Sequence, residues 1–302
     1  MKPSRRVALE PAYLLHHRAW RDSSRVVELL TRDRGRVSLF AKGARRAGNA
    51  WRAVLQPFAP LLVSWSGPGD GGTLTAAELS AGPQALPPAR LLSGFYLNEL
   101  LLKLLSPEDP HPEVFESYAA AIAELGELAT PAQHEARTLR LFEKRLLDAL
   151  GLGLDYAHLA GGGERLDPDA YYHVRPQHGV VDVAGAGRPA GAAVADCYRG
   201  AHLLSLAAEE LGDAAALAAA RQLLREALAA PLDGRKLASR GVARALKARS
   251  DAARRSTSWS WTWRRSSRRC SVMLSAPACS ASSAASSGSG LRARRTCRSV
   301  AT

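Results

Sequence analysis

The sequence predicts an α+β protein in which an N-terminal five-stranded OB-like β-barrel precedes a mainly α-helical domain. Two observations lead to this prediction. Short β-like runs alternate with turn residues up to residue 79. After the proline-rich linker at residues 83–88, apolar residues recur at helical spacing. We therefore expect an OB-fold domain over residues 1–82, a helical domain over residues 83–250 and a tail over residues 251–302.

The expected barrel consists of five β-like runs separated by turn residues. Asp33–Gly35 forms a tight turn between the second and third runs, because glycine accepts the backbone that such a turn needs. The glycine-rich stretch Ser66–Gly72 joins the fourth run to the fifth. An OB-like barrel presents an open face and loops to oligonucleotides, although the fold alone does not establish that function. The runs are Ala12–Trp20, Arg25–Thr31, Gly35–Ala41, Gln56–Ser64 and Thr73–Leu79.

Helical periodicity dominates the second domain. Pro112 and Pro131 stand where a helix favours proline in its first turn, and Gly151 follows the third predicted helix. A short β-hairpin is expected at about residues 171–183. The expected helices are Arg90–Leu105, Pro112–Leu128, Pro131–Leu150, Arg199–Leu211, Ala214–Ala229 and Lys236–Lys247.

The net charge of +13 is distributed unevenly along the chain. Residues 1–52 hold 13 Lys/Arg and 4 Asp/Glu, whereas residues 53–253 hold 18 and 24, and residues 254–302 hold 10 and none. Positive charge concentrated in one folded segment is typical of a protein that binds a polyanion such as nucleic acid. The alternatives are a solvated basic face and an adaptor whose basic face meets an acidic protein rather than DNA.

The last segment, residues 251–302, is rich in Ser and Arg and follows none of these patterns, so we expect a disordered basic tail. Two explanations stay open: a tail that adds non-specific affinity for DNA, and translation in a shifted reading frame, which we favour. No apolar stretch is long enough to span a membrane, and the first ten residues lack an apolar signal core. We expect a cytoplasmic protein.

Motifs for enzymatic chemistry are missing from the sequence. The glycine-rich stretch Gly185–Gly191 has the wrong spacing for dinucleotide binding and is interrupted by Pro189. The carboxylate pairs Glu108/Asp109 and Asp167/Asp169 stand where helix capping or loop structure explains them. The four cysteines show no disulfide or metal-ligand spacing. We therefore expect no catalytic residues, no metal and no cofactor.

Cations and aromatic residues lie close together in the first domain. Single-strand binders combine cations that follow the phosphate backbone with aromatic rings on which bases stack. The aromatic residues among these cations are Phe40, Trp51, Phe58 and Trp65, and core packing is the alternative for each of them. Trp51 is the best stacking candidate, whereas Phe58 and Trp65 are expected to face the barrel interior. The predicted DNA-binding residues are Arg32, Arg34, Arg36, Lys42, Arg45, Arg46, Trp51 and Arg52.

Several sequence strings, in this order, resemble the bacterial RecO family of recombination mediators. The resemblance covers about residues 5–250 and ends where the Ser/Arg-rich tail begins. The strings are Tyr13–His16 (YLLH), Ser23–Thr31 (SSRVVELLT), Gly35–Arg45 (GRVSLFAKGAR), Leu55–Phe58 (LQPF), Gly94–Leu101 (GFYLNELL), Leu139–Glu143 (LRLFE), Leu150–Leu152 (LGL) and Gly234–Arg240 (GRKLASR).

The resemblance implies an OB-fold and a helical domain that bind single- and double-stranded DNA and anneal complementary strands. It also implies a role in DNA repair and recombination by the RecF pathway, in which the protein helps RecR load RecA onto DNA coated by single-strand-binding protein, without enzymatic turnover. A nucleoid-associated location follows. Some members carry a four-cysteine zinc site in the helical domain, but Cys197 is the only cysteine in that region here, so no metal is expected.

The family also recognises the acidic, Phe-ended tail of single-strand-binding protein, and the third predicted helix has chemistry that suits it. An apolar notch edged by cations can take an aromatic anchor together with its carboxylates. The alternative is an ordinary amphipathic helix with its apolar stripe in the core. The candidate residues are Arg137, Leu139, Arg140, Phe142, Lys144 and Leu146.

Overall fold

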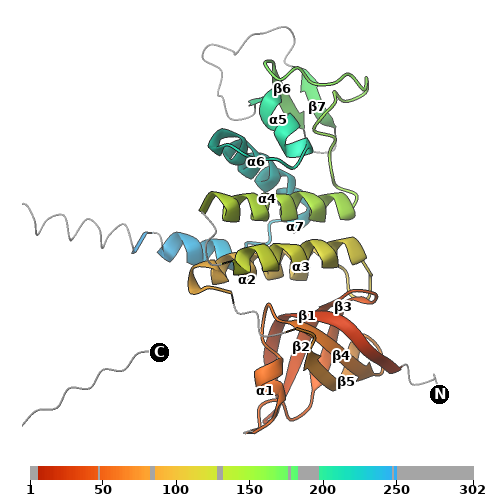
Figure 1. Cartoon of the computed structure of the whole chain (residues 1–302). Coiled ribbons are helices and arrows are strands. Elements are labelled where there is room, and N and C mark those ends of the chain that lie inside the picture. The colour runs from red at the N-terminus through yellow and green to blue at the C-terminus, as the bar shows by residue number, and fades with distance from the viewer. Residues whose placement is uncertain are drawn as a thin grey trace, which may run out of the picture. The chain divides into compact units, whose positions relative to one another are not determined.

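The computed structural model contains a closed five-stranded barrel followed by a helical region, which confirms the predicted fold class (Figure 1). It describes residues 6–46, 48–81, 86–127, 132–175, 178–182, 197–246 and 248–249. The predicted tail and the glycine-rich stretch Gly185–Gly191 lie outside these residues. The barrel strands follow the order β1-β2-β3-β5-β4. They are β1 (Arg6–Trp20), β2 (Ser24–Thr31), β3 (Gly35–Ala41), β4 (Pro60–Ser66) and β5 (Asp70–Leu79).

The barrel closes by two pairings between strands that are distant in sequence. β1 pairs antiparallel with β4, and β3 pairs in parallel with β5 over Ser38–Phe40. Side chains alternate along the strands, so that Val37, Leu39 and Ala41 of β3 point into the barrel core. Trp65 lies in the same core, as expected.

The fourth strand starts later than predicted. Residues 51–54 form a single helical turn, α1 (Trp51–Val54), and β4 begins only at Pro60. Phe58 has a left-handed backbone (φ 70°), and its ring packs against Phe95 with 5.0 Å between centroids. Phe58 therefore belongs to the core of the helical region, and the expectation that it faces the barrel interior is wrong.

The helical region packs around a second hydrophobic core that includes Leu97, Tyr118, Phe142 and Leu224. A small sheet of order β7-β6-β8 accompanies the helices. No helix among the described residues is long and apolar enough to cross a membrane. The elements are η1 (Pro88–Arg90), α2 (Leu91–Leu104), α3 (Pro112–Gly126), α4 (Ala132–Ala149), β6 (Tyr171–Arg175), β7 (Gly179–Asp182), β8 (Cys197–Arg199), α5 (Gly200–Ala207), α6 (Ala214–Ala227), α7 (Ala229–Leu232) and a last helix at residues 238–246.

The outer face of the barrel is divided between a covered part and an open part. Tyr13 packs against Phe115 and Tyr118 of α3, with ring centroids 5.4 and 5.1 Å apart. The amide of Asn98 in α2 donates to the Leu15 carbonyl (2.9 Å). Helices α2 and α3 thus cover the middle of β1 at Tyr13 and Leu15, while the end of this strand, from residue 16 to residue 20, is exposed.

Candidate nucleic-acid interface

The predicted DNA-binding cations fall into two groups at opposite ends of β3. Arg32, Arg34 and Arg36 lie at the turn where β3 begins, and Lys42 and the cations after it lie beyond its last residue, Ala41. A strand of seven residues is about 20 Å long, because each residue adds roughly 3.3 Å. The predicted residues therefore do not form one continuous surface.

The arginines at the start of β3 contact the helical region. Arg36 pairs with Glu28 (3.1 Å), and its Nε donates to the carbonyl of Leu105 at the end of α2 (3.2 Å). Arg32 pairs with Glu116 of α3 (3.3 Å). These contacts hold the barrel against the helices, so the charges of Arg32 and Arg36 are already compensated by carboxylates of the same chain.

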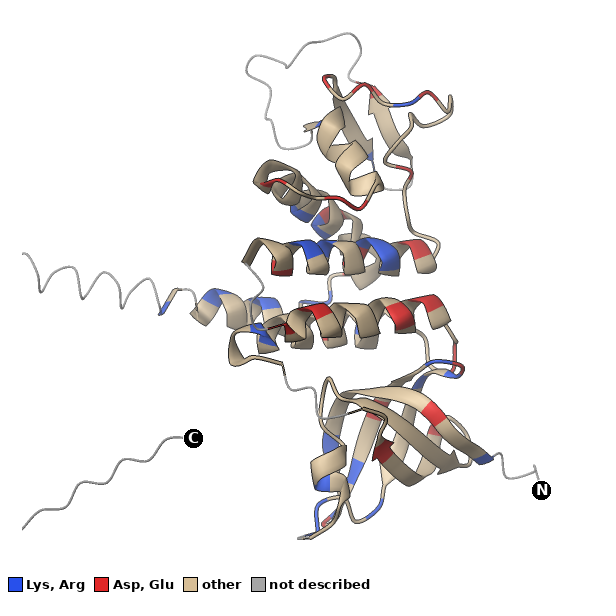
Figure 2. Cartoon of the chain, viewed as in Figure 1, with Lys and Arg blue, Asp and Glu red and all other residues tan. Residues whose placement is uncertain are grey.

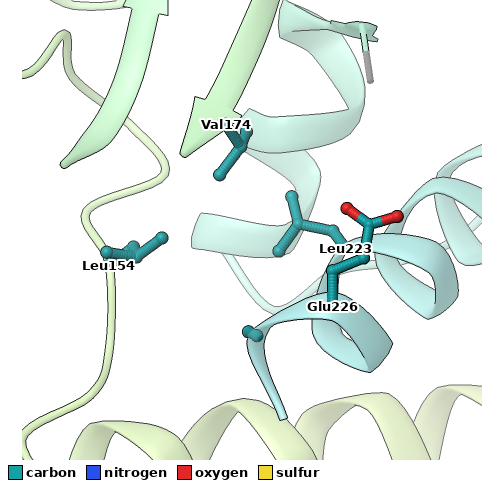
Figure 3. Close-up of a pocket in the computed structure, with 5 residues that line it drawn as sticks. Leu154, Val174, Leu223 and Glu226 are labelled. Atoms are coloured by element: carbon teal, nitrogen blue, oxygen red, sulfur yellow. The ribbon is translucent and has the colours of Figure 1, made fainter. Parts of the chain in front are cut away.

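Arg34 lines a pocket of about 240 Å³ at the same end of the barrel, together with Asp33, Glu108 and Trp65. The pocket carries both signs of charge, which does not favour a phosphate. A second depression, in the helical region, is lined by Leu154, Val174, Leu223 and Glu226 (Figure 3). It offers about 10 Å³, which is room for no more than a single water molecule.

The other four cations lie on the segment between β3 and β4. Lys42, Arg45, Arg46 and Arg52 are all exposed. Among the described residues, no carboxylate pairs with any of them. Figure 2 shows lysine and arginine positions gathered around α1 and the adjacent loops. Uncompensated, exposed cations of this kind are free to bind phosphates.

Local hydrogen bonds fix the backbone that presents these cations. Arg45 donates its backbone N–H to the Ser23 carbonyl (2.9 Å) and its guanidinium to the Arg21 carbonyl (3.1 Å). Asn49 donates its amide to the Gly43 carbonyl (2.9 Å), and its Oδ1 accepts from the backbone N–H of Trp51 (2.8 Å). The segment is therefore tied both to itself and to the turn between β1 and β2.

Trp51, the predicted stacking residue, is placed differently from the expectation. It opens the helical turn α1 instead of lying in a loop, and it is half-buried against the barrel core. Much of the Trp51 side chain is therefore buried by core packing, because the apolar residues of the short helix α1 pack against the barrel.

An aromatic pair on the open outer face of the barrel joins Phe40, one of the predicted aromatic candidates, to Trp20, which was not singled out from the sequence. Trp20 is 38% exposed, and its ring lies 5.4 Å from that of Phe40. The guanidinium of Arg18 is 5.9 Å from the centre of the Trp20 ring. Val26 of β2 alternates with the core residues Val27 and Leu29, so its side chain lies on the outer face of the barrel. It is nevertheless only 3% exposed, because its neighbours in register are Arg18 on β1 and Phe40 on β3.

The two groups of side chains meet at one end of the barrel. Arg25 pairs in register with both Ala19 and Ala41, so it connects the strand of Trp20 to the start of the cationic segment. Burial, the charge of Arg25 and the neighbouring His16 lower the pKa of His17, in that order of effect. Burial disfavours the charged imidazolium, and the positive charge of Arg25 adds to that effect. We call this surface the basic barrel end; its residues are Arg18, Trp20, Arg21, Arg25, Phe40, Lys42, Arg45, Arg46 and Arg52.

Comparisons with known proteins cover both parts of the structure. Residues 6–83 match the family described as "Recombination protein O N terminal", and residues 87–241 match "Recombination protein O C terminal". The chain belongs to the RecO family. A "DNA repair protein RecO" of Alkalilimnicola ehrlichii is 43% identical over 80% of this chain and 92% of its own length. Proteins with the same description from Azoarcus sp. and Haemophilus influenzae are 41% and 38% identical, over 80% and 77% of this chain and 97% and 94% of their own lengths.

The apolar residues predicted to bind an acidic tail do not form a surface notch in this RecO-family chain. Phe142 and Leu146 are each 1% exposed, because α4 packs between α3 and α6 and buries its apolar stripe in the core. Leu139 is partly buried against the same core. The apolar stripe is therefore occupied by the chain's own helices.

The predicted cations of α4 have partners within the chain. Arg140 is 9% exposed and pairs with the buried Glu143 (2.7 Å). Arg137 donates to the carbonyls of Glu209 and Glu210, and Lys144 pairs with Asp148 and Glu209. Sequence periodicity shows the charged stripe, but not that the loop at residues 209–210 closes over it.

Cys197 lies beside His173, with its sulfur 3.6 Å from the ring nitrogens. In the part of the chain that the structure describes, no three His, Cys, Asp or Glu side chains are arranged to hold a metal ion.

Proposed function

We propose that the basic barrel end binds single-stranded DNA. Lys42, Arg45, Arg46 and Arg52 contact phosphates, and the Trp20–Phe40 pair provides the flat surface on which a base stacks. The observation that carries the proposal is the exposed ring of Trp20, packed on the half-buried Phe40, beside cations that no carboxylate of the described residues compensates. Because cations recognise phosphates rather than bases, double-stranded DNA binds to the same surface.

The proposed role is that of a non-enzymatic mediator in DNA repair and homologous recombination. The resemblance to RecO supports annealing of complementary strands and cooperation with RecR in loading RecA onto DNA coated by single-strand-binding protein. Binding alone suffices for these steps, so no catalytic residue and no cofactor is required. A cytoplasmic, nucleoid-associated location follows from binding to DNA.

Single-strand-binding protein remains a proposed partner. Because the apolar stripe of α4 is buried, we propose that an acidic tail contacts the side chains at the edge of this helix, Arg137, Leu139 and Lys144, in competition with Glu209. A labelled acidic, Phe-ended peptide tests this contact. Replacing Lys144 with Ala should weaken its binding, and unchanged binding would exclude this site.

A salt series of fluorescence anisotropy with a labelled single-stranded oligonucleotide tests DNA binding. Each lost phosphate contact lowers the slope of log K against log salt by about 0.7, so Lys42→Ala/Arg46→Ala should flatten it by about 1.4. The matched control is Arg221→Ala/Arg225→Ala, which removes two exposed cations of α6. If Lys42→Ala/Arg46→Ala keeps the slope of the parent, the basic barrel end is not the DNA site. If the parent itself does not bind the oligonucleotide, the alternative function, a protein-binding adaptor, takes the place of DNA binding.

A further inference from the structure

The last described helix, at residues 238–246, carries positive charge that the barrel site does not use. The chain has no acidic residue between Gly234 and Arg249. Residues 241–246 are exposed throughout, and Lys236 and Arg244 are among the exposed cations of this segment. Figure 2 shows lysine and arginine positions along this last described helix. We call residues 235–246 the C-terminal arm.

Glu99 of α2 holds the start of this helix. Its carboxylate accepts hydrogen bonds from the backbone N–H groups of Ala238 and Ser239 (2.8 and 3.0 Å) and from the Ser239 hydroxyl (2.7 Å). Burial raises the pKa of Glu99, but the hydrogen bonds from Ser239, Ala238 and Lys103 outweigh it and lower the pKa to about 2. A carboxylate at this position satisfies backbone donors that a helix start leaves free.

A second contact, made by Arg240, also holds this helix in place. Its guanidinium donates to the hydroxyl of Tyr96 (2.9 Å) and lies 5.3 Å from the centre of the Tyr96 ring. The Tyr96 hydroxyl in turn donates to Glu143, a fully buried carboxylate that pairs with Arg140. The arm is thus joined through side chains to α2 and α4.

These two attachments leave the remaining cations of the arm pointing away from the core. Arg235 donates only to the carbonyls of Leu232 and Pro231, which do not neutralise its charge. Among the described residues, no carboxylate pairs with Lys236 or Arg244. Cations held on an anchored helix lose little conformational entropy when they bind a polyanion.

We propose that the C-terminal arm is a second DNA-contacting surface, in which Arg235, Lys236 and Arg244 bind backbone phosphates. It extends the proposed function from the barrel to the helical region and rests on DNA being the ligand. Phosphates suit a segment that has several exposed cations and no acidic residue of its own, and the contact is independent of base sequence.

A protein partner is the rival occupant, because Val242 and Leu246 are 47% and 49% exposed. Two aliphatic side chains are a small part of the roughly 20–30 residues that each side of a stable interface contributes. The cations of the arm outnumber its two exposed aliphatic side chains, and positive charge favours DNA as the ligand.

Salt-dependent binding of the labelled oligonucleotide to the full chain tests this surface. We expect Lys236→Ala/Arg244→Ala to flatten the slope of log K against log salt by about 1.4. Neither residue has a side-chain partner among the described residues, so the variant should fold, which a thermal melt checks. The α6 control Arg221→Ala/Arg225→Ala should leave the slope unchanged.

The barrel variant Lys42→Ala/Arg46→Ala separates the two proposals. If it flattens the slope and the arm variant does not, the arm is not a DNA surface, while the barrel site stands. If only the arm variant flattens the slope, the arm stands and the barrel proposal fails. A parent chain that does not bind the oligonucleotide contradicts both.

Discussion

Trp20 and Phe40 lie against each other on the outer face of the barrel, with 5.4 Å between their ring centroids. They come from β1 and β3, and β2 runs between them. Folding usually buries most of the surface of a large aromatic side chain, yet Trp20 keeps 38% of its surface exposed. Beside the cations of the basic barrel end, this pair is the feature that most specifically suits a single strand of nucleic acid.

Replacing Trp20 with alanine should weaken binding of a single-stranded oligonucleotide by about 1–3 kcal/mol, the usual contribution of one stacked base. Because stacking carries no net charge, the slope of the salt dependence should stay the same. Trp20→Phe keeps an aromatic ring and should retain most of the affinity. Anisotropy titrations at one salt concentration measure the loss, and equal affinities of Trp20→Ala and the parent would show that no base stacks there.

Gly35 should tolerate no side chain. Its backbone is left-handed (φ 68°), and an added Cβ would lie 2.1 Å from the Asp109 carbonyl oxygen in the loop between α2 and α3. Gly35→Ala should therefore lower the free energy of unfolding by more than about 2 kcal/mol, since strain and a backbone clash add. Urea unfolding measures it.

The control for this substitution is Gly71→Ala. Gly71 has a similar backbone (φ 83°), but no atom lies within 4 Å of the added Cβ. Only the conformational strain of about 1–2 kcal/mol should appear there. Equal losses at the two glycines would mean that the contact of Gly35 with Asp109 does not matter for stability.

The Glu99 cap should make the stability of the C-terminal arm depend on pH. The pKa of Glu99 in the folded chain is about 2, below its ordinary value of 4.5, so its contribution is complete above pH 4.5 and is lost as the pH falls toward 2. Glu99→Gln should cost about 0.5–2 kcal/mol at pH 7, the usual value of a lost helix cap.

Amide hydrogen exchange at Ala238 and Ser239 reports on this cap directly. The difference in protection between the parent and Glu99→Gln should be large at pH 7 and smaller at pH 3. A difference that stays constant over this range would show that the ionised carboxylate is not what holds the helix.

Much of the fold could be predicted from the sequence because its signals are local. β3 coincides with the predicted run Gly35–Ala41, and α3 and α6 begin at their predicted residues. Phe58 and the parallel pairing of β3 with β5 could not be predicted in this way. Both depend on which distant segment packs beside them, and alternation within one strand does not contain that information.

The candidate site was predictable only in part, for the same reason. Charge clustering indicates Lys42, Arg45 and Arg46, but it does not separate them from Arg36, which pairs with Glu28. Trp20 ends a predicted strand, and only the register across β1, β2 and β3 brings it to Phe40. Likewise, the contact of Glu99 with Ser239 joins residues 140 positions apart.

The most direct measurement of the central claim compares two triple variants from opposite ends of β3 in the same salt series. Lys42→Ala/Arg45→Ala/Arg46→Ala and Arg32→Ala/Arg34→Ala/Arg36→Ala each remove three positive charges. We expect the first to flatten the slope of log K against log salt by about 2 and the second to leave it unchanged. A flattened slope for the second variant with a normal slope for the first would contradict a DNA site at the basic barrel end.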